Sequence, residues 1–320
     1  MTPNMDSTNI TPSSDTQFGF VSVIGAPNAG KSTLMNQMVG AKISIVSPKA
    51  QTTRTRVLGI VVHEHDGHKT QIAFVDTPGI FKAQKRRLDK AIVAAAWEGV
   101  VDSDAILYIV DASLKNPLAH NQDILTGLKS QQLGKKKVTL VLNKVDLIKP
   151  EKLLKLTAAF NNEFDFEATF MVSAEKNRGV GDILNYYTKR LPAGPFMYPE
   201  DELTDMPARL MAAEITREQV FRKLHDELPY NMAVDTEAWD ERADGSIEVH
   251  QVIYVTREAH KPIVLGKGGQ KIKAMGMAAR QEMEKIFERP FHVKLFVKVR
   301  EQWDEDPEHY RIWGLDPHQN

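Results

Sequence analysis

The fold of this chain is decided by residues 25–32, which read Gly25-Ala26-Pro27-Asn28-Ala29-Gly30-Lys31-Ser32. The stretch before them, residues 18–24, is apolar and rich in β-branched side chains, which predicts a buried strand. The stretch after them, residues 31–39, places Leu34 and Met38 four positions apart, on one face of a predicted helix. Strand, G-x-x-x-x-G-K-S loop and helix in this order predict a phosphate-binding loop.

The residue types of this loop suit phosphate chemistry. Its glycines let backbone N–H groups turn toward an anion without a Cβ clash, and the following helix presents its positive end to the same anion. We expect Lys31 to reach the β- and γ-phosphates of a nucleotide and the Ser32 hydroxyl to bind magnesium. The predicted nucleotide-binding set is the whole loop together with Thr33.

The second motif is Asp76-Thr77-Pro78-Gly79, followed by Ile80. Asp76 ends an apolar run, residues 72–75, which predicts a position at the carboxyl edge of the sheet, where ligands of open α/β sheets bind. A D-x-x-G segment alone is a weak signal, but after a phosphate loop it is specific. We expect Asp76 to hold magnesium through water and the Gly79 N–H to sense the γ-phosphate.

Two further motifs predict guanine as the base. Asn143-Lys144-Val145-Asp146 follows a predicted strand, and the Asp146 carboxylate can accept hydrogen bonds from both N1–H and N2–H₂ of guanine. Adenine lacks these donors and would leave the carboxylate unpaired. Ser173-Ala174-Glu175 comes next, and here we expect the Ala174 N–H to point at guanine O6. An ATPase is therefore disfavoured.

Residues 51–54, Gln51-Thr52-Thr53-Arg54, lie between the first and second motifs. We expect a threonine of this segment to contact magnesium when the γ-phosphate is present. The segment would then be ordered with GTP and disordered with GDP, which is a switch. We favour Thr53, and Thr52 stays open. The predicted catalytic set is Lys31, Thr53, Asp76 and Gly79.

Composition sets outer limits on function. The chain has 320 residues, 42% apolar and 26% charged, which indicates a globular protein of about two domains. The net charge of -1 excludes a strongly positive field over the whole molecule, so any nucleic-acid surface must be local. With 0 cysteines, disulfides, thiolate metal sites and cysteine nucleophiles are excluded. No apolar run is long enough to predict a membrane span, and peripheral membrane contact stays open. The lack of cysteine fits a reducing compartment, and we expect a cytoplasmic protein.

The order of elements predicts an α/β fold, a mostly parallel sheet with helices on both faces. Asp66-Gly67 predicts a hairpin between two strands, which adds an antiparallel edge strand. Predicted strands cover residues 18–24, 57–63, 70–75, 105–110, 138–142 and 168–172. Predicted helices cover residues 31–39, 85–99, 118–132, 151–163 and 180–190.

A proline-rich stretch then divides the chain, because it holds four prolines between residues 191 and 207 and helix cannot continue through them. Beyond it we expect a small α+β domain, with helices near 208–227 and 269–287 and strands near 231–239, 246–256 and 291–299. The expected division is a disordered tail (1–17), a nucleotide-binding domain (18–191), a linker (192–206), a second domain (207–305) and a C-terminal extension (306–320).

The five motifs together resemble those of the Era family of bacterial GTPases. The resemblance extends into the second domain, where residues 263–273 (Ile-Val-Leu-Gly-Lys-Gly-Gly-Gln-Lys-Ile-Lys) are similar to the G-x-x-G segment of a type II KH domain. It covers roughly residues 18–305. It implies a GTPase that assists maturation of the small ribosomal subunit by binding the 3′ end of its ribosomal RNA, in some relatives with peripheral association with the inner membrane.

The G-x-x-G segment alone is a weak signal, so the prediction of an RNA-binding loop depends on the residues around it. We place it between an apolar strand and a helix, and residues 266–280 carry four basic side chains and no acidic one. A KH domain clamps about four nucleotides with such a loop. The predicted RNA-binding residues are Gly266, Lys267, Gly268, Gly269, Lys271, Lys273 and Arg280. Arg217, Arg222 and Lys223 either extend this surface or form a solvated helix face.

The resemblance also carries expectations about hydrolysis. Asn28 occupies the loop position that helps coordinate potassium in related GTPases, so the cofactors are Mg²⁺ and, from the resemblance, K⁺. Ile80 stands where other GTPases have a water-orienting glutamine, and an apolar side chain cannot orient water. Slow intrinsic hydrolysis that depends on a cation or a partner is therefore expected. The protein is expected to be a monomer. Glu175 departs from the commoner lysine but agrees with Era-like sequences.

Other interpretations stay open. One is a regulatory GTPase that acts on a protein or membrane partner through its second domain. Another is a GTPase of RNA-modifying metabolism, although no second catalytic constellation is visible. His63, His65 and His68 cluster at the predicted hairpin, where a solvated tip is favoured over a metal site.

Overall fold

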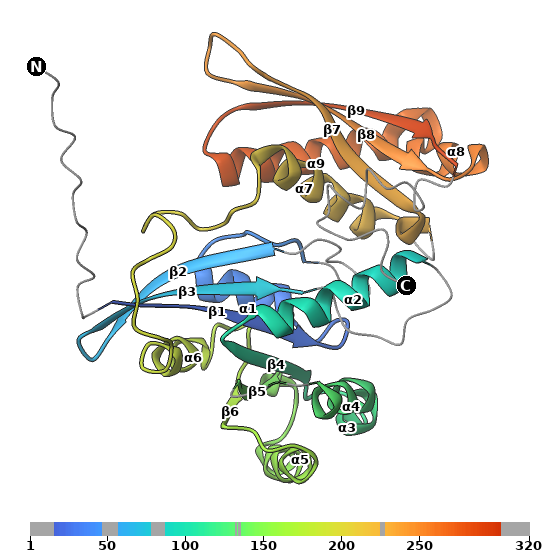
Figure 1. Cartoon of the computed structure of the whole chain (residues 1–320). Helices are drawn as coiled ribbons and strands as arrows, with labels where there is room; N and C mark the ends of the chain where they lie inside the picture. The colour runs from blue at the N-terminus through green and yellow to red at the C-terminus, as the bar shows by residue number, and fades with distance from the viewer. Residues whose placement is uncertain are drawn as a thin grey trace, which may run out of the picture.

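The computed structural model describes residues 16–46, 57–77, 87–131, 133, 136–224 and 228–301. They form two units, an α/β unit with a six-stranded sheet and a smaller unit with a three-stranded sheet (Figure 1). The first unit contains β1 (Thr16–Gly25), α1 (Lys31–Val39), β2 (Val57–His65), β3 (His68–Asp76), α2 (Arg87–Asp102), β4 (Ala105–Asp111), α3 (Pro117–His120), α4 (Gln122–Ser130), β5 (Lys137–Asn143), α5 (Pro150–Glu163), β6 (Ala168–Met171) and α6 (Val180–Tyr187).

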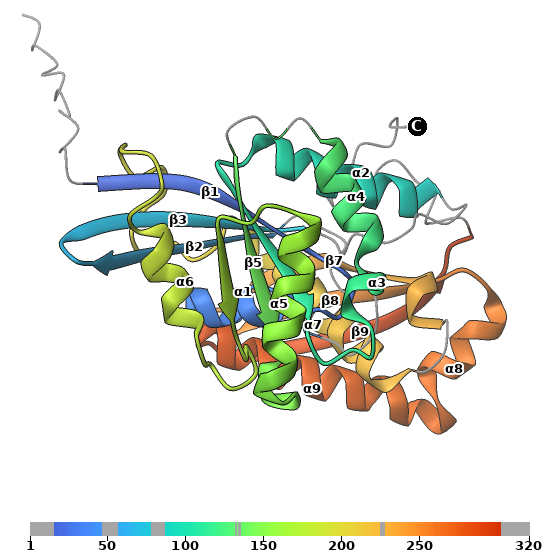
Figure 2. The ribbon, with the colours of Figure 1, turned by 90° about the horizontal axis from the view of Figure 1, so that it is seen from below.

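The large sheet has the order β2-β3-β1-β4-β5-β6. All neighbouring strands are parallel except β2 and β3, so the predicted parallel sheet with one antiparallel edge strand is confirmed. Both faces are apolar because alternate side chains of each buried strand point to opposite sides. Val21 and Val23 pack beneath α1 and α6, whereas Ile24 packs beneath α2, α4 and α5. Figure 2 shows the helices around this sheet from below.

The hairpin between β2 and β3 turns at two residues with left-handed backbone, Asp66 (φ 50°) and Gly67 (φ 79°). Two such residues in succession are the requirement of a type I′ turn, whose twist matches that of the strands it joins. The predicted Asp-Gly hairpin is therefore confirmed. It sets the register in which Val57, the first residue of β2, pairs with Asp76, the last residue of β3.

The second unit contains α7 (Ala208–Lys223), β7 (Met232–Glu241), β8 (Ile247–Val255), α8 (Lys261–Leu265), α9 (Gln270–Phe287) and β9 (Phe291–Val299). Its strands lie in the order β7-β8-β9, with β8 antiparallel to β7 and parallel to β9. A parallel neighbour requires a crossover connection, which α8 and α9 supply. Val220, Ile253 and Met275 belong to the core between these helices and the sheet.

The proline-rich connection lies on the first unit over part of its length. Gln71, a buried residue of β3, accepts hydrogen bonds from the N–H groups of Met197 and Tyr198 at 2.9 and 3.0 Å. Further along, the Ile60 N–H of edge strand β2 donates to the Leu203 carbonyl at 2.9 Å. The connection is thus fixed to β2 and β3 up to Leu203.

The structure corrects three local predictions. Residues 261–265, which precede the G-x-x-G segment, form helix α8 and not a strand, because Pro262 suits the first turn of a helix and a short apolar run does not distinguish the two. The helix expected over 118–132 is broken at Asn121 into α3 and α4. The helix expected over 208–227 ends at Lys223.

A further correction concerns Arg217. Its side chain is neither part of a basic surface nor solvated, because it is only 2% exposed and pairs with Glu214. In the part of the chain that the structure describes, no helix is long and apolar enough to cross a bilayer.

Candidate functional site

The predicted phosphate loop connects β1 to α1 as expected. Gly30 caps the N-terminus of α1 with φ 96°, and Asn28 also has left-handed backbone, with φ 62°. A Cβ on Gly30 would lie 2.2 Å from the Asn143 side-chain nitrogen, so only glycine fits there. The loop therefore directs the N–H groups at the start of α1 toward one position, as an anion site requires.

Lys31 lies buried beneath the loop. Its Nζ donates to the carbonyls of Gly25 at 3.0 Å and Ala26 at 3.1 Å. Burial lowers the pKa of Lys31 to about 8, although the nearby Asp76 carboxylate opposes this shift. A lysine with a depressed pKa in such a place has a strong preference for added negative charge, which nucleotide phosphates would supply.

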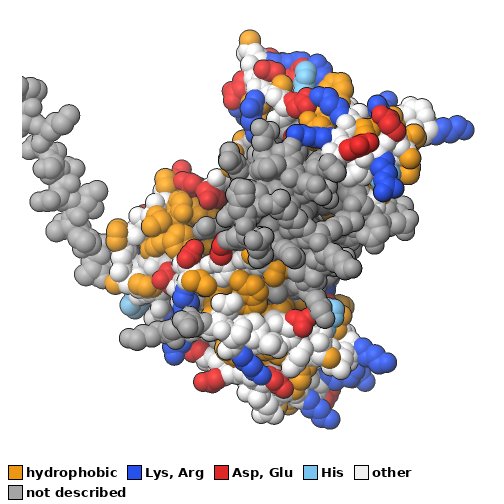
Figure 3. All heavy atoms as spheres, turned by 45° about the vertical axis from the view of Figure 1, so that its right-hand side comes forward, with side chains coloured by type: hydrophobic (Ala, Val, Ile, Leu, Met, Phe, Trp, Pro, Cys, Tyr) orange, Lys and Arg blue, Asp and Glu red, His pale blue; other side chains and the backbone are white. Residues whose placement is uncertain are grey.

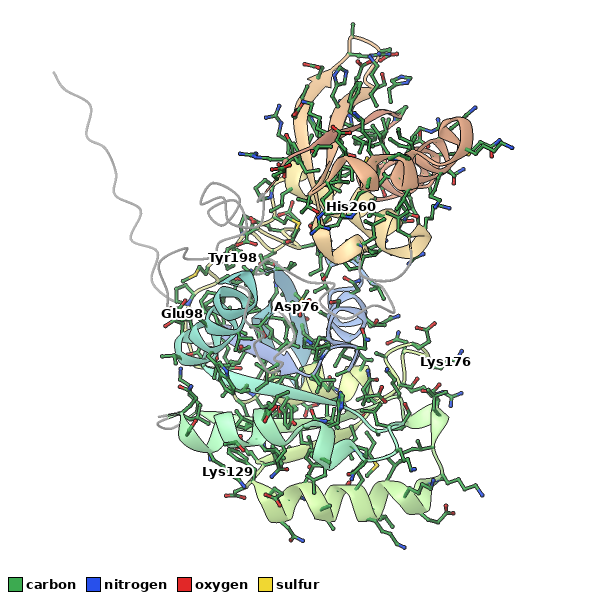
Figure 4. All side chains as sticks on the ribbon, turned by 90° about the vertical axis from the view of Figure 1, so that its right-hand side faces the viewer. Asp76, Glu98, Lys129, Lys176, Tyr198 and His260 are labelled. Atoms are coloured by element: carbon green, nitrogen blue, oxygen red, sulfur yellow. The ribbon has the colours of Figure 1, made fainter. Side chains whose placement is uncertain are left out.

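Ser32 and Asp76 meet at the end of β3, which brings the first and second motifs together. The Ser32 hydroxyl donates to Asp76 Oδ2 at 2.9 Å, and the Ser44 hydroxyl donates to the same oxygen at 3.1 Å. Asp76 is fully buried, and Figure 4 shows it on the side of the α/β unit nearest the second unit. A hydroxyl and a carboxylate this close to a phosphate loop fit the oxygen chemistry that Mg²⁺ prefers.

Asn143 joins three predicted motifs. Its side-chain amide donates to the Ala29 carbonyl of the loop at 2.9 Å, and its Oδ1 accepts from the Ala174 N–H at 3.0 Å. Lys144 has left-handed backbone, with φ 63°, and its Nζ donates to the Asn28 carbonyl at 2.8 Å and to Asp111 at 2.5 Å. These bonds hold the ends of β1, β4, β5 and β6 in one arrangement.

Asp146 lies at the exposed end of this arrangement. The Ser173 hydroxyl hydrogen-bonds to its carboxylate and holds the pKa of Asp146 below its usual range, so the group stays ionised and able to accept. Val145 donates its N–H to the Val172 carbonyl at 3.2 Å, which fixes the Asn-Lys-Val-Asp segment against the strand that leads into Ser173.

The last motif is placed less directly. The Ala174 N–H, expected to point at guanine O6, donates to Asn143 Oδ1 in this structure, so reading O6 would require that bond to be shared or exchanged. Glu175 of the same motif is exposed. In the second motif, the Thr77 hydroxyl donates to the Val23 carbonyl at 2.8 Å and so fixes the start of the Asp-Thr-Pro-Gly segment to β1. Predicted site residues Thr52, Thr53, Pro78, Gly79 and Ile80 lie outside the described residues.

The predicted G-x-x-G segment links α8 to α9. Gly266, Gly268 and Gly269 have φ angles of 71°, 58° and 76°, in the region that favours glycine. A Cβ on Gly266 would lie 2.7 Å from the Cβ of Lys271, so the loop and the first turn of α9 approach closely. Lys267 is exposed at the tip. The segment is therefore a glycine-shaped turn with basic side chains around it.

A groove runs along α9 beside this loop. It has a volume of about 360 Å³ and is lined by Ile272, Lys273, Gly276, Met277, Arg280, Val293 and Leu295. Two of these, Lys273 and Arg280, are predicted RNA-binding residues. Figure 3 shows that basic and acidic side chains are interspersed over the visible face of this unit.

Prediction from sequence missed the apolar lining of the groove. Met277 is 51% exposed, an unusual exposure for such a side chain, and Ile272 and Gly276 lie one turn apart on the same helix face. The signal was present, because Ile272, Gly276 and Arg280 follow a four-residue spacing. Val293 and Leu295 alternate along β9, but which face they take depends on how β9 packs.

The histidines of the hairpin lie at an end of the large sheet, and one of them contacts α6. His63 Nε2 lies 2.8 Å from Asn185 Oδ1, and across the described ranges no three acidic, histidine or cysteine side chains are grouped to hold a metal ion.

Two family models match the chain. Residues 20–144 match the model described as 50S ribosome-binding GTPase, and residues 227–304 match the model described as KH domain. The first match lies within the α/β unit and ends after β5, and the second covers the smaller unit from the end of α7 onward.

Curated relatives and solved structures match nearly the whole chain. GTPase Era of Sinorhizobium medicae is 53% identical over 301 residues, which cover 94% of each chain. The crystal structure of a point variant of Aquifex aeolicus Era bound to GDP·AlF4⁻ has a TM-score of 0.83, is 35% identical and covers 93% of this chain and 99% of that one. An Era structure in complex with MgGDPNP and nucleotides 1506–1542 of 16S ribosomal RNA has a TM-score of 0.86, is 36% identical and covers the same shares.

Proposed function

The chain belongs to the Era family of GTPases, and from this premise we propose that it is a GTP-hydrolysing switch for assembly of the small ribosomal subunit. In this proposal the KH domain binds small-subunit ribosomal RNA near its 3′ end, and the nucleotide state of the GTPase domain times that binding. One observation carries the proposal: the same chain holds two sites. Ser32 and Asp76 meet at a phosphate loop in the first domain, and the second domain has an apolar groove with basic side chains in its lining.

Phosphate binding falls to the loop and Lys31. The N–H groups at the start of α1 face the β- and γ-phosphates, and Lys31 transfers its hydrogen bonds from the Gly25 and Ala26 carbonyls to phosphate oxygens. Negative charge at this position raises the pKa of Lys31 again, so the lysine is charged when nucleotide is bound.

Magnesium would be held by the Ser32 hydroxyl and, through water, by Asp76. When bound, the ion neutralises charge that develops on the phosphate oxygens. Thr53 and the Gly79 N–H complete the proposed catalytic set with Lys31 and Asp76, and their contribution is to fix the γ-phosphate. Support in this structure is the 2.9 Å contact between Ser32 and Asp76.

Guanine selection falls to Asp146. Its carboxylate, kept ionised by Ser173, accepts from N1–H and N2–H₂ of the base. Asn143 and Lys144 contribute by holding the phosphate loop to the base-binding loops. The Ala174 N–H is the proposed donor to guanine O6.

Hydrolysis is proposed to be slow without help. Ile80 offers no polar group to orient the attacking water, so the rate depends on a cation or on the RNA partner. Potassium is the proposed cation, with Asn28 beside the β- and γ-phosphates as a ligand. A rate that is several-fold higher in K⁺ than in Na⁺ would support this assignment, and equal rates would contradict it.

RNA binding is assigned to the KH loop and groove. Gly266 and Gly269 allow close approach of a phosphodiester backbone, Lys267 and Lys271 add charge, and Lys273 and Arg280 line the groove that receives the bases. A monomer in the cytoplasm, with peripheral contact at the inner membrane, completes the proposal.

The test is RNA affinity in two nucleotide states. A short RNA from the 3′ end of small-subunit ribosomal RNA is titrated with the protein bound to GDP or to a non-hydrolysable GTP analogue. We expect tighter binding with the analogue, and a loss of about 30-fold or more when Lys267→Glu and Lys271→Glu are combined.

The matched control is Lys152→Glu with Lys155→Glu, which makes the same charge change on exposed positions of α5. Equal loss in both double variants would mean that only net charge matters. Weak binding that is indifferent to nucleotide would contradict the proposal and favour a protein or membrane partner.

A further inference from the structure

A short segment, residues 42–46, lies between the nucleotide site and the second domain. It follows α1, whose C-terminus is capped by Gly40 with left-handed backbone, φ 78°. The Asn36 side chain shapes it, because its Oδ1 accepts from the N–H groups of Ile43 and Ser44 and its Nδ2 donates to the Ser44 carbonyl at 2.8 Å. We call residues 42–46 the coupling segment.

On its inner side the coupling segment contacts the magnesium position. Ser44 is buried, and its hydroxyl donates to Asp76 Oδ2 at 3.1 Å, the same oxygen that accepts from Ser32. A carboxylate oxygen that receives two hydroxyl donors has a narrow range of orientations. The position of Ser44 therefore affects where the Asp76 carboxylate points.

On its outer side the coupling segment is held by the KH domain. Lys42 Nζ lies 2.7 Å from Glu218 of α7 and 2.8 Å from Glu282 of α9. Glu218 is fully buried and also pairs with Arg222 at 2.5 Å, and Arg222 in turn lies 3.5 Å from the Val46 carbonyl. Both ends of the coupling segment are thus in contact with charged residues of the second domain.

These contacts surround a groove and not a sealed interface. The groove has a volume of about 370 Å³, and residues of α1, the coupling segment and α7 line it. Glu282 is partly buried, which opposes ionisation, yet Lys42 keeps the pKa of Glu282 below its usual range. When Lys42 separates from Glu218, Arg222 of the same helix still pairs with this buried carboxylate, so the junction can open without leaving the charge unpaired.

We propose that Ser44 is a positioning residue for the Asp76 carboxylate and that the KH domain acts on it through Lys42. The inference rests on the proposed function, in that Asp76 is taken to hold magnesium and the KH domain to bind RNA. Movement of α7 and α9 when RNA binds would then alter magnesium and nucleotide binding, and nucleotide would alter RNA binding by the same factor.

The first experiment needs no RNA. Release of a fluorescent GDP analogue is followed while Mg²⁺ is varied, with wild type, Ser44→Ala and Lys42→Ala. We expect the Mg²⁺ concentration that gives half-maximal retention to rise about 5- to 10-fold for Ser44→Ala, because a hydrogen bond to the carboxylate is lost. Lys42→Ala should raise it about 2- to 5-fold, because the restraint that the KH domain places on the coupling segment is lost.

The controls separate coupling from general damage. Lys129→Ala removes an exposed lysine that pairs with Glu163 at 2.8 Å within the GTPase domain, and it should leave the Mg²⁺ dependence unchanged. Ser44→Thr keeps the hydroxyl and should restore retention. Lys42→Glu should act like Lys42→Ala or more strongly, and combining it with Glu282→Lys should recover at least half of the effect.

The second experiment measures RNA affinity with GDP and with the GTP analogue. In wild type we expect RNA to bind roughly 5-fold or more tightly with the GTP analogue than with GDP. In Lys42→Ala the two affinities should differ by less than about twofold. An unchanged ratio and an unchanged Mg²⁺ dependence in Lys42→Ala would overturn the inference. If wild type fails to bind RNA, the proposed function fails, and the Mg²⁺ experiment still decides the role of Ser44 and Lys42.

Discussion

The nucleotide site and the KH groove are built in different ways. In the nucleotide site, short loops at the ends of parallel strands bring backbone groups and a few side chains together, with Asn143 tying the loops to one another. In the KH groove, the face of one helix and one strand supplies an apolar floor with Lys273 and Arg280 beside it. The first site depends on backbone shape, whereas the second depends on how an element packs.

This difference affects what a substitution does. A site made of individually placed hydrogen bonds loses much when one polar group is mismatched, because the partner remains desolvated. A groove made of charge and apolar area loses a moderate amount at each position, because no single contact determines the binding. Substitutions in the two sites should therefore differ in size and in salt dependence.

The largest effect is expected at the base-binding loop. Asp146→Asn should lower GTP affinity by about 10³- to 10⁴-fold, because the amide presents a donor to a donor of guanine. Xanthosine triphosphate, whose base carries an acceptor there, should bind the variant better than GTP does. Titration with fluorescent nucleotides measures both. A loss of GTP affinity below tenfold would show that this site is not more sensitive than the groove.

A smaller effect is expected from a charge in the groove. Lys273→Ala should lower RNA affinity about 5- to 10-fold at moderate salt and make the dependence of log affinity on log salt shallower by about one, as for loss of one phosphate contact. Fluorescence anisotropy at several salt concentrations provides the slope. An unaltered slope would mean that Lys273 makes no phosphate contact.

The apolar floor should respond in another manner. Met277→Ala should lower RNA affinity about 3- to 5-fold, from lost contact with a base, and leave the salt slope unchanged. Measured beside Lys273→Ala on the same RNA, the pair separates apolar contact from charge within one groove. If Met277→Ala altered the slope as well, the two kinds of contact could not be assigned to separate residues.

The smallest effect concerns protons at Lys31. In the nucleotide-free protein its pKa is about 8, and bound phosphates raise that pKa, so nucleotide binding at pH 8 should take up about half a proton. Uptake should increase above pH 8 and vanish near pH 6, where Lys31 is already charged. Calorimetry in two buffers of different ionisation enthalpy measures it. Lys31→Met should remove this uptake, and persistence of the uptake would assign it to another group.

The comparison also explains what could be predicted from sequence. The strand–loop–helix around residues 25–32 and the Asp66-Gly67 turn follow from local chemistry, since left-handed backbone favours glycine, asparagine or aspartate. The order of buried strands follows from apolar periodicity. Fold class and the nucleotide-site motifs were therefore accessible without coordinates.

What could not be predicted depends on packing between distant segments. Tertiary contacts override local preference at two places. They make residues 261–265 a helix and not a strand, and they bury Arg217. The contacts of Lys42 with Glu218 and Glu282 join residues far apart in the chain, and no spacing rule connects them. The apolar floor of the groove also depends on packing between separate segments, because α9 and β9 both contribute to it.

The fixed connection between the domains has a kinetic consequence. Because the chain is held to β2 and β3 as far as Leu203, and α7 begins at Ala208, only a few residues separate the anchor from the KH domain. A tether this short keeps a separated partner at an effective concentration in the millimolar range or above. When the ion pairs with Lys42 separate, the KH domain therefore stays close to the GTPase domain. Individually weak ion pairs are then enough for the contact to form again after each separation.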